Sequence, residues 1–138
     1  MPIHHGTCHC GTVAFQADLD FTQPTSRCNC SFCRKTRNWS QRIADPASLI
    51  VTQGADAISH YHGRTAGPVP HISHAFCRQC GTRLFSIGDI PELGGRFASV
   101  FLPALDDVTE AELISAPLVW CDGLHGNWWN APTETRHL

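Results

Sequence analysis

The sequence predicts a mainly β protein built from small antiparallel sheets, and three observations support this fold class. Short segments rich in β-branched and aromatic residues recur along the chain, separated by turns that contain glycine or proline. The best helical candidate, residues 106–113, is short. Seven of the 8 cysteines stand in tight local groups, at spacings typical of metal-binding turns. At 138 residues, we expect a single domain over residues 1–138.

The expected elements follow the turn signals in chain order. The segment after the Cys8-His9-Cys10-Gly11 turn alternates in part like a strand, and residues 31–36 can form a turn of helix. Asp45-Pro46 and Gly54 mark turns between the next segments. We assign no element from Asp122 onward. The expected strands are residues 12–17, 39–44, 49–52, 57–62, 71–76, 82–87, 96–102 and 118–120.

Composition and charge argue against several classes of protein. No apolar run reaches the roughly 18 residues of a transmembrane helix, and residues 1–5 lack the apolar segment of a signal peptide. We therefore expect a cytoplasmic protein. The formal net charge of -2 and the absence of a polybasic run predict no nucleic-acid or membrane partner. Disulfides are rare in the cytoplasm, so clustered cysteines there more often bind metal or perform redox chemistry.

Two of the cysteine groups are pairs that a glycine follows directly. Short spacings such as C-x-C and C-x2-C direct two sulfur atoms toward one metal ion from a tight turn. A single pair supplies only half of a tetrahedral site, so each pair needs a partner. The sequence therefore predicts one structural zinc site with four thiolate ligands, Cys8, Cys10, Cys77 and Cys80.

The third group supplies only three thiols, from Cys28, Cys30 and Cys33. Three protein ligands leave one position on a zinc ion open, as in catalytic zinc sites. Zinc that three thiolates hold is a weak Lewis acid, which suits an incoming thiol better than a hydrolytic water. Coordination lowers the pKa of such a thiol, so its thiolate forms at neutral pH. Alternatively, a histidine or Cys121 closes the site and makes it structural; a buried strand cysteine is the other interpretation of Cys121.

Residues near the third group are candidate ligand contacts. Arg34 and Lys35 could hold the carboxylates of a small thiol, or could only offset the negative charge of the metal centre. Trp39 is a candidate to line a ligand pocket because it lies close in sequence. The weaker basic candidates are Arg37, Arg42 and Arg64.

The histidines have two interpretations. His60 and His62 are two residues apart, and His71 and His74 are three apart. Either pair could transfer protons or supply a fourth zinc ligand, but such histidines more often belong to the polar face of a strand. Alternation along the chain predicts that His9 points away from the metal that its neighbours bind.

The motifs also carry a resemblance to a known family. They read Gly6-Thr7-Cys8-His9-Cys10-Gly11-Thr12-Val13-x-Phe15, then Cys28-Asn29-Cys30-Ser31-x-Cys33-Arg34-Lys35, then Phe76-Cys77-x2-Cys80-Gly81-Thr82-x-Leu84. In order and spacing they resemble the glutathione-dependent formaldehyde-activating enzyme family, which includes the centromere protein V domain. The family usually has a glycine shortly after the Arg-Lys pair, where this chain reads Thr36-Arg37-Asn38-Trp39.

The resemblance implies a fold, two metal ions and an activity. It implies a zinc-stabilised β-tent fold, structural zinc at the four paired cysteines, and a second zinc at Cys28, Cys30 and Cys33, where the family's glutathione site lies. The implied activity is that of a carbon–sulfur lyase. Glutathione or a similar small thiol binds at the open zinc, and its adduct with formaldehyde or another small aldehyde, of the S-hydroxymethylglutathione type, is formed or cleaved.

Two other classes of function stay open from the sequence. The first is a non-enzymatic zinc-stabilised interaction module, or a carrier of thiol adducts. The second is a thiol redox protein in which Cys77 and Cys80 cycle as a disulfide; the glycine that follows each pair favours metal binding over this alternative.

Overall fold

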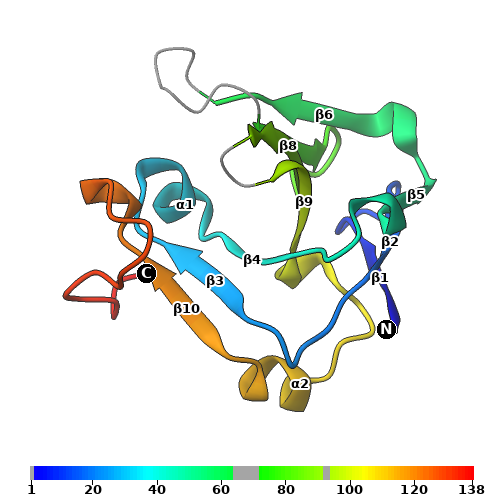
Figure 1. The fold of residues 1–138 in the computed structure, drawn as a ribbon. Coiled ribbons are helices and arrows are strands. Elements are labelled where there is room, and N and C mark those ends of the chain that lie inside the picture. Colours follow the sequence, from blue (N-terminus) through cyan, green and yellow to red (C-terminus); the bar gives the residue numbers. More distant parts are fainter. Residues whose placement is uncertain (1, 64–71, 92–93) are drawn as a thin grey trace.

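The structure, a computed structural model, describes residues 2–63, 72–91 and 94–138, and its strands form two sheets (Figure 1). The smaller sheet has the strand order β1-β2-β5, and the larger has the order β10-β3-β4-β9-β8-β7-β6. This confirms a mainly β fold. The strands are β1 (Ile3–Thr7), β2 (Ala14–Asp18), β3 (Thr25–Cys28), β4 (Trp39–Arg42), β5 (Ile50–Gln53), β6 (Ile58–Tyr61), β7 (Ile72–Cys77), β8 (Arg83–Ile90), β9 (Gly95–Phe101) and β10 (Leu118–Cys121).

One strand pair departs from the antiparallel pattern. Strand β10 runs parallel to β3, with Cys121 opposite Cys28, whereas the other pairs of named strands are antiparallel. Figure 1 shows β3 and β10 side by side, both ending near helix α1 (Ser31–Thr36). The late strand therefore brings the C-terminal segment to the place where the third cysteine group begins.

Helices are short, and local signals define them. Helix α2 (Glu110–Ser115) begins later than the expected 106–113 because Thr109 caps it in a capping box with Glu112. Helix α1 coincides with the expected turn at 31–36. Single 3-10 turns occur at η1 (Pro46–Ser48), η2 (Ala55–Ala57), η4 (Leu102–Ala104) and η5 (Gly123–His125). Among the described residues, no helix is both long and apolar enough to cross a membrane.

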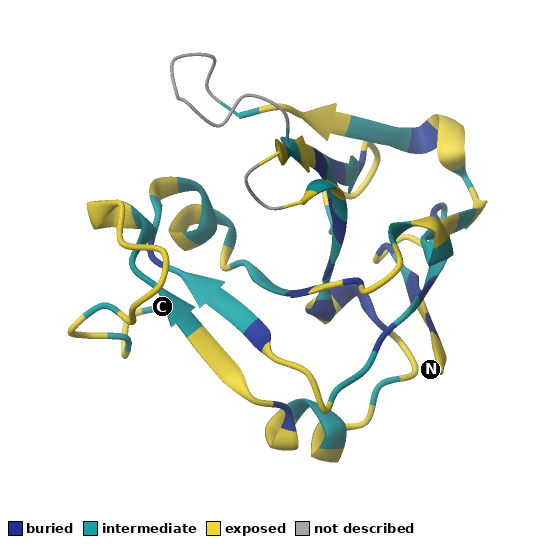
Figure 2. Cartoon of the chain, viewed as in Figure 1, coloured by how far each residue is buried: buried dark blue, intermediate teal, exposed yellow. Residues whose placement is uncertain are grey.

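The core lies where the smaller sheet meets the middle of the larger one. Buried side chains gather along β2, β8 and β9 (Figure 2), and the Phe15 and Phe85 rings contact edge-to-face at 5.7 Å. Gly6 on β1 lies opposite Phe15 on β2, and a Cβ there would stand 2.5 Å from the Phe15 ring. Strand β1 therefore fits against the core only because this position carries no side chain.

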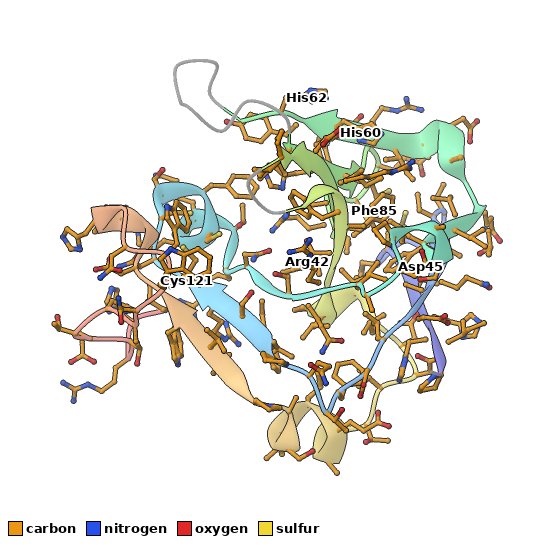
Figure 3. All side chains as sticks on the ribbon, in the orientation of Figure 1. Arg42, Asp45, His60, His62, Phe85 and Cys121 are labelled. Carbon is orange, nitrogen blue, oxygen red and sulfur yellow. The ribbon has the colours of Figure 1, made fainter. Side chains whose placement is uncertain are left out.

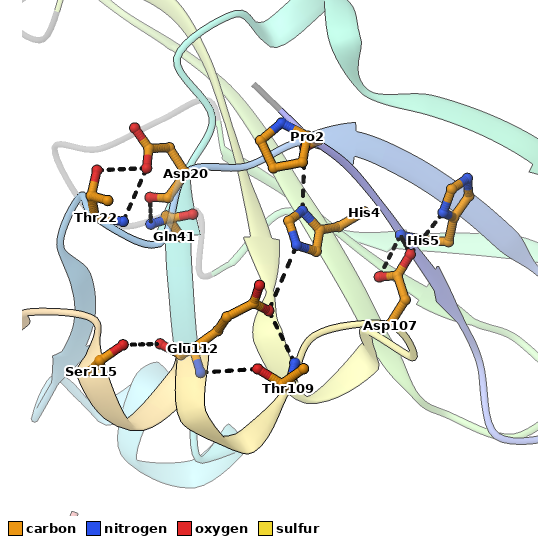
Figure 4. Close-up of polar contacts among 10 residues, drawn as sticks. All are labelled: Pro2, His4, His5, Asp20, Thr22, Gln41, Asp107, Thr109, Glu112 and Ser115. Carbon is orange, nitrogen blue, oxygen red and sulfur yellow. Dashed lines mark hydrogen bonds and ion pairs between the residues drawn. The ribbon is translucent and has the colours of Figure 1, made fainter.

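Polar contacts connect β1 to the segment around α2 (Figure 4). The His5 imidazole lies 2.8 Å from the Asp107 carboxylate, which also accepts from the His5 backbone N–H. His4 is buried, and its Nε2 lies 4.0 Å from Glu112 Oε2. Both β1 and β3 are strands that the sequence pattern did not predict, because they are rich in polar residues.

Candidate functional site

The four paired cysteines meet at one point. Their sulfur atoms all lie within 4.8 Å of one another. The separations are 3.6 Å from Cys8 to Cys10 and 3.8 Å from Cys10 to Cys77. Zinc–sulfur bonds of about 2.3 Å in a tetrahedron place sulfur atoms about 3.8 Å apart. The group therefore fits a zinc ion, and such an ion would join the turn after β1 to the turn after β7.

The two turns have matching local structure. The Gly11 N–H donates to the Cys8 carbonyl, and the Gly81 N–H donates to the Cys77 carbonyl, with positive φ at both glycines. The fourth cysteine, Cys80, lies 3.2 Å from the Thr82 hydroxyl, and hydrogen bonding with Thr82 lowers the pKa of Cys80 to about 5. A lowered thiol pKa favours the thiolate that a metal requires.

The third cysteine group lies at the other end of the larger sheet. Cys28 ends β3, Cys30 is the N-cap of α1 and Cys33 lies in its first turn, so three sulfur atoms gather within 4.8 Å. The Cys30 N–H donates to Cys28 Sγ at 3.4 Å, and the Cys33 N–H donates to Cys30 Sγ at 3.3 Å. Backbone donors directed at sulfur stabilise thiolates, as a metal site requires.

The protonation of this group also fits a bound cation. Hydrogen bonds with Cys28 and Cys33 lower the pKa of Cys30 to about 2, and hydrogen bonds with Cys28 and Cys30 raise the pKa of Cys33. The three thiols therefore compete for the negative charge. A divalent cation facing all three sulfur atoms would remove this competition, because it would favour the thiolate form of each.

Cys121 does not belong to this group. It is half-buried on β10 opposite Cys28, at the α1 end of the two strands (Figure 3), and burial raises the pKa of its thiol. Among the described residues, no further histidine, cysteine or carboxylate ligand atom lies within 4.8 Å of all three sulfurs. The three-sulfur group therefore leaves a coordination position that these residues do not fill.

Asn29, between the first two ligands, connects the three-sulfur group to the C-terminal segment. Its buried amide donates to Asp122 Oδ1 at 2.8 Å and accepts from the Leu124 N–H at 2.9 Å. Gly123 packs so closely that an added Cβ would lie 2.7 Å from Cys28 Sγ and 2.6 Å from the Trp128 ring. Sequence reasoning assigned no role to this segment; its signal is the Asp-Gly pair after β10.

A groove of about 620 Å³ opens beside the three-sulfur group. Helix α1 forms one side with Cys30 and Cys33, and the end of β6 and strand β7 form the other, with Trp128 from the C-terminal segment at its border. Aromatic rings dominate the wall: Phe32 stacks on His74 at 4.1 Å and on Tyr61 at 5.8 Å. The groove is large enough for a small peptide and much larger than formaldehyde.

Of the basic and aromatic residues that the sequence offers as ligand contacts, only some line the groove. Lys35 lines it, whereas Arg34 borders a small cavity on another side of the group, with Arg27, Arg37 and Leu138. The structure does not bring Trp39 to the groove, because its ring packs against the core and its indole N–H donates to Thr25 Oγ1 at 2.9 Å. Arg42, whose guanidinium lies 5.6 Å from the Phe97 ring, does not line the groove, and Arg64 lies outside the described residues.

The candidate histidines also differ in whether they line the groove. His62 and His74 line the groove. His60 on β6 (Figure 3) instead forms a hydrogen bond of 2.8 Å with Ser73 Oγ on β7. None of these three belongs to a metal-ligand group. His9 is exposed and outside the four-sulfur group, as expected, and His71 lies outside the described residues.

Arg83 is a central residue that sequence reasoning missed. Its half-buried guanidinium lies over the Phe32 ring at 4.9 Å and donates to Asn38 Oδ1 at 2.7 Å and to Ser86 Oγ at 3.3 Å. Burial lowers its pKa, and the charge of Cys33 opposes this shift. Among the described residues, no carboxylate lies within ion-pair distance of Arg83. Its nearest source of negative charge is therefore the cysteine group.

Comparison with known proteins agrees with this arrangement. The family of the glutathione-dependent formaldehyde-activating enzyme matches residues 3–122, a span that contains both cysteine groups. The chain belongs to this family.

Two individual proteins resemble the chain. A Halomonas elongata protein, whose name provisionally assigns it as a glutathione-dependent formaldehyde-activating enzyme, is 34% identical over 98 residues, which are 68% of this chain and 62% of the relative. The match thus spans less than two thirds of that relative's length. A crystal structure of a Rhodobacter sphaeroides protein is 28% identical, with a TM-score of 0.64, and covers 83% of this chain and 99% of that one.

Proposed function

We propose that this protein binds glutathione or a similar small thiol beside the three-cysteine group and catalyses formation or cleavage of its adduct with formaldehyde or another small aldehyde. One observation carries this proposal. The incomplete ligand group, Cys28, Cys30 and Cys33, borders a groove of about 620 Å³, whereas the complete four-sulfur group stands apart between two turns. Family membership supports the choice of thiol and aldehyde.

Both cysteine groups are proposed to hold zinc. The sulfur-only ligand sets suit this metal, and the four-sulfur group would serve structure alone. A zinc ion at the three-sulfur group would lower the pKa of an added thiol, so that its thiolate is present at neutral pH. Three thiolates and one zinc ion carry a net charge of about -1, which the guanidinium of Arg83 balances from β8.

The chain's own residues would orient the ligand. The Lys35 ammonium lines the groove and can bind a carboxylate of a peptide thiol. The rings of Phe32, Tyr61 and Trp128 offer apolar surface to the rest of the ligand and exclude water from it. Arg34 and Trp39, which lie outside the groove, are left out of this assignment.

The state of the cysteines supports a proposal for the cellular compartment. None of the eight cysteines forms a disulfide, and disulfides are rare in the reducing cytoplasm, where clustered thiols stay available for metal. We propose that the protein is cytoplasmic.

The proposal is tested by exchange spectroscopy. Glutathione and formaldehyde combine without a catalyst, so the measurement is the rate of exchange between formaldehyde hydrate and S-hydroxymethylglutathione, by two-dimensional NMR, with and without zinc-loaded protein. The expected result is faster exchange with protein, lost in a Cys30→Ser variant. Glutathione binding with no acceleration would instead identify a carrier of thiol adducts. Absence of both would favour the interaction module.

A further inference from the structure

His74 occupies a special position in the groove. It lies on β7 facing α1, its ring stacks on Phe32 at 4.1 Å, and it lines the groove together with Cys30 and Cys33. It lies three residues before Cys77 but belongs to neither cysteine group. His74 is therefore available for a role other than holding the metal.

The contacts of one ring nitrogen fix the tautomer of His74. The Arg83 Nη2 lies 3.3 Å from His74 Nδ1, and a guanidinium has donors but no acceptor. His74 Nδ1 must therefore be the acceptor. The Ser86 hydroxyl lies 2.7 Å from the same nitrogen and accepts from Arg83 at 3.3 Å, so its own hydrogen is free to point at Nδ1.

The second ring nitrogen must carry the proton. With Nδ1 occupied by donors, a neutral imidazole has its hydrogen on Nε2. Protonation of Nδ1 as well would place a second cation against Arg83. Burial and the charge of Arg83 accordingly lower the pKa of His74 to about 4.

The Nε2–H group is free to donate, and its residue lines the groove. Among the described residues, no hydrogen-bond partner of His74 Nε2 occurs, whereas Nδ1 has two. Of the residues that the structure describes, the one fully buried side-chain nitrogen or oxygen atom without a hydrogen-bond partner is Gln41 Oε1. His74 Nε2, which also has no partner, is therefore not fully buried. Because His74 lines the groove, a ligand bound there can accept a hydrogen bond from Nε2.

We propose that His74 uses its Nε2–H to donate a hydrogen bond to the oxygen atom of the thiol–aldehyde adduct. This inference rests on the proposed function. In the addition, the thiolate sulfur forms a bond to the aldehyde carbon, and the π electrons of the carbonyl move to its oxygen. That oxygen then takes a proton from water. In cleavage the proton returns to water, the carbonyl re-forms and the carbon–sulfur bond breaks.

The role of His74 is to stabilise charge on this oxygen, not to transfer a proton. A neutral imidazole with a hydrogen on Nε2 is a donor at the position where negative charge develops. The Nδ1 contacts exclude its use as a general base through that nitrogen. Arg83 and Ser86 are therefore positioning residues, because they set which nitrogen of His74 carries the hydrogen.

The tautomer is tested directly on the zinc-loaded protein by two-dimensional ¹H–¹⁵N NMR of the imidazole rings, which separates the two neutral forms from imidazolium. The His74 signals are assigned by their loss in His74→Gln. We expect a neutral ring with its hydrogen on Nε2 from pH 5.5 to 8, roughly one unit or more above its lowered pKa. A hydrogen on Nδ1, or an imidazolium at pH 6, would overturn the proposal whether or not the protein binds thiols.

The role in the reaction is tested with three variants. His74→Phe keeps a ring against Phe32 but has no donor, and we expect kcat for adduct exchange to fall about a hundredfold to a thousandfold with glutathione affinity unchanged. His74→Gln, which keeps an N–H donor, should retain more activity than His74→Phe. His60→Phe is the matched control: this histidine also bonds a serine hydroxyl on the same sheet but does not line the groove.

The possible results separate the two proposals. Equal kcat in wild type and His74→Phe, with glutathione bound by both, overturns the role of His74 and leaves the proposed function intact. Absence of any acceleration by the wild type overturns the proposed catalysis, and the NMR measurement still decides whether Nε2 of His74 carries the hydrogen. Equal losses in His74→Phe and His60→Phe would also reject a specific role.

Discussion

The guanidinium of Arg83 on β8 lies 4.9 Å from the centre of the Phe32 ring on α1. In the sequence, Phe32 stands between two cysteines of the three-sulfur group. The same group donates to Asn38 just beyond the helix and to Ser86 on its own strand. Arg83 therefore fixes α1, and with it the three-sulfur group, against the larger sheet.

Replacement of Arg83 by methionine should destabilise this region. It keeps apolar bulk but removes the donor to Asn38, so we expect a loss of about 2 to 4 kcal/mol in unfolding free energy, with weaker metal binding at the three-sulfur group. Urea denaturation and zinc competition measure the two effects. Arg78→Met, at an exposed arginine, is the matched control. Equal stability of the two variants would show that Arg83 is dispensable.

Serine substitutions distinguish the three-sulfur ligand set from a closed one. Cys28→Ser should reduce the zinc content by one ion per chain and abolish glutathione binding, because two thiolates hold zinc poorly. Cys121→Ser should change neither, since Cys121 is not among the grouped sulfurs. Elemental analysis of the purified variants measures the zinc content, and calorimetric titration measures glutathione binding. Loss of an ion in Cys121→Ser would mean that this thiol is a fourth ligand.

A chelator should separate the two metals. The three-sulfur group offers one ligand fewer and borders an open groove, so its zinc should leave first, without loss of β structure by circular dichroism. Later removal of the zinc ion at the four-sulfur group should unfold the ends of β1 and β7, at or just after which the cysteines of that group lie. Simultaneous release of both ions with unfolding would contradict the assignment of separate structural and open sites.

Arg37 should be a source of conformational strain. It is the C-cap of α1 with a φ of 53°, the one non-glycine residue with positive φ among those described. Arg37→Gly should be more stable than Arg37→Ala by about 1 kcal/mol, because both remove the same side chain but only glycine tolerates this backbone. Thermal unfolding compares them. Equal melting temperatures would exclude strain at this position.

The pH dependence of stability should report on His74. Its pKa is about 4 in the folded protein and near 6.5 ordinarily, so between these values the unfolded chain binds more protons. The contribution of His74 to stability is therefore full above pH 6.5 and declines as the pH falls toward 4. His74→Gln should lose stability less steeply than wild type between pH 7 and pH 5, in urea titrations with zinc present. Parallel curves would show that His74 is not neutral in the fold.

The sequence predicted the strands that have apolar alternation and missed the two that do not. Residues 82–87 and 96–102 correspond to β8 and β9, which form the core. Strand β1 has two histidines and a glycine, and its buried positions are His4 and Gly6. His4 is covered by its contact with Glu112 of α2, and Gly6 by the Phe15 ring, so neither position has a local apolar signal. Strand β3 is polar because it ends at the cysteine group.

Only the part of the site that depends on residue spacing in the sequence could be predicted. Local groups of cysteines indicate metal ligands without any tertiary information, and both groups are assembled as expected. Trp39 was expected at the pocket because it lies near the cysteines in sequence, but strand alternation turns it to the core. Arg83 and His74 become neighbours of α1 only because β7 and β8 pair beside it, a relationship with no local signal.

The most direct test of the account is a native mass spectrum of the protein with and without added glutathione, which counts metal ions and ligand together. The account predicts two zinc ions per chain and one glutathione, bound only to molecules that carry the second zinc. Two zinc ions with no bound thiol, at glutathione concentrations found in cells, would contradict it and identify the three-sulfur group as a structural site.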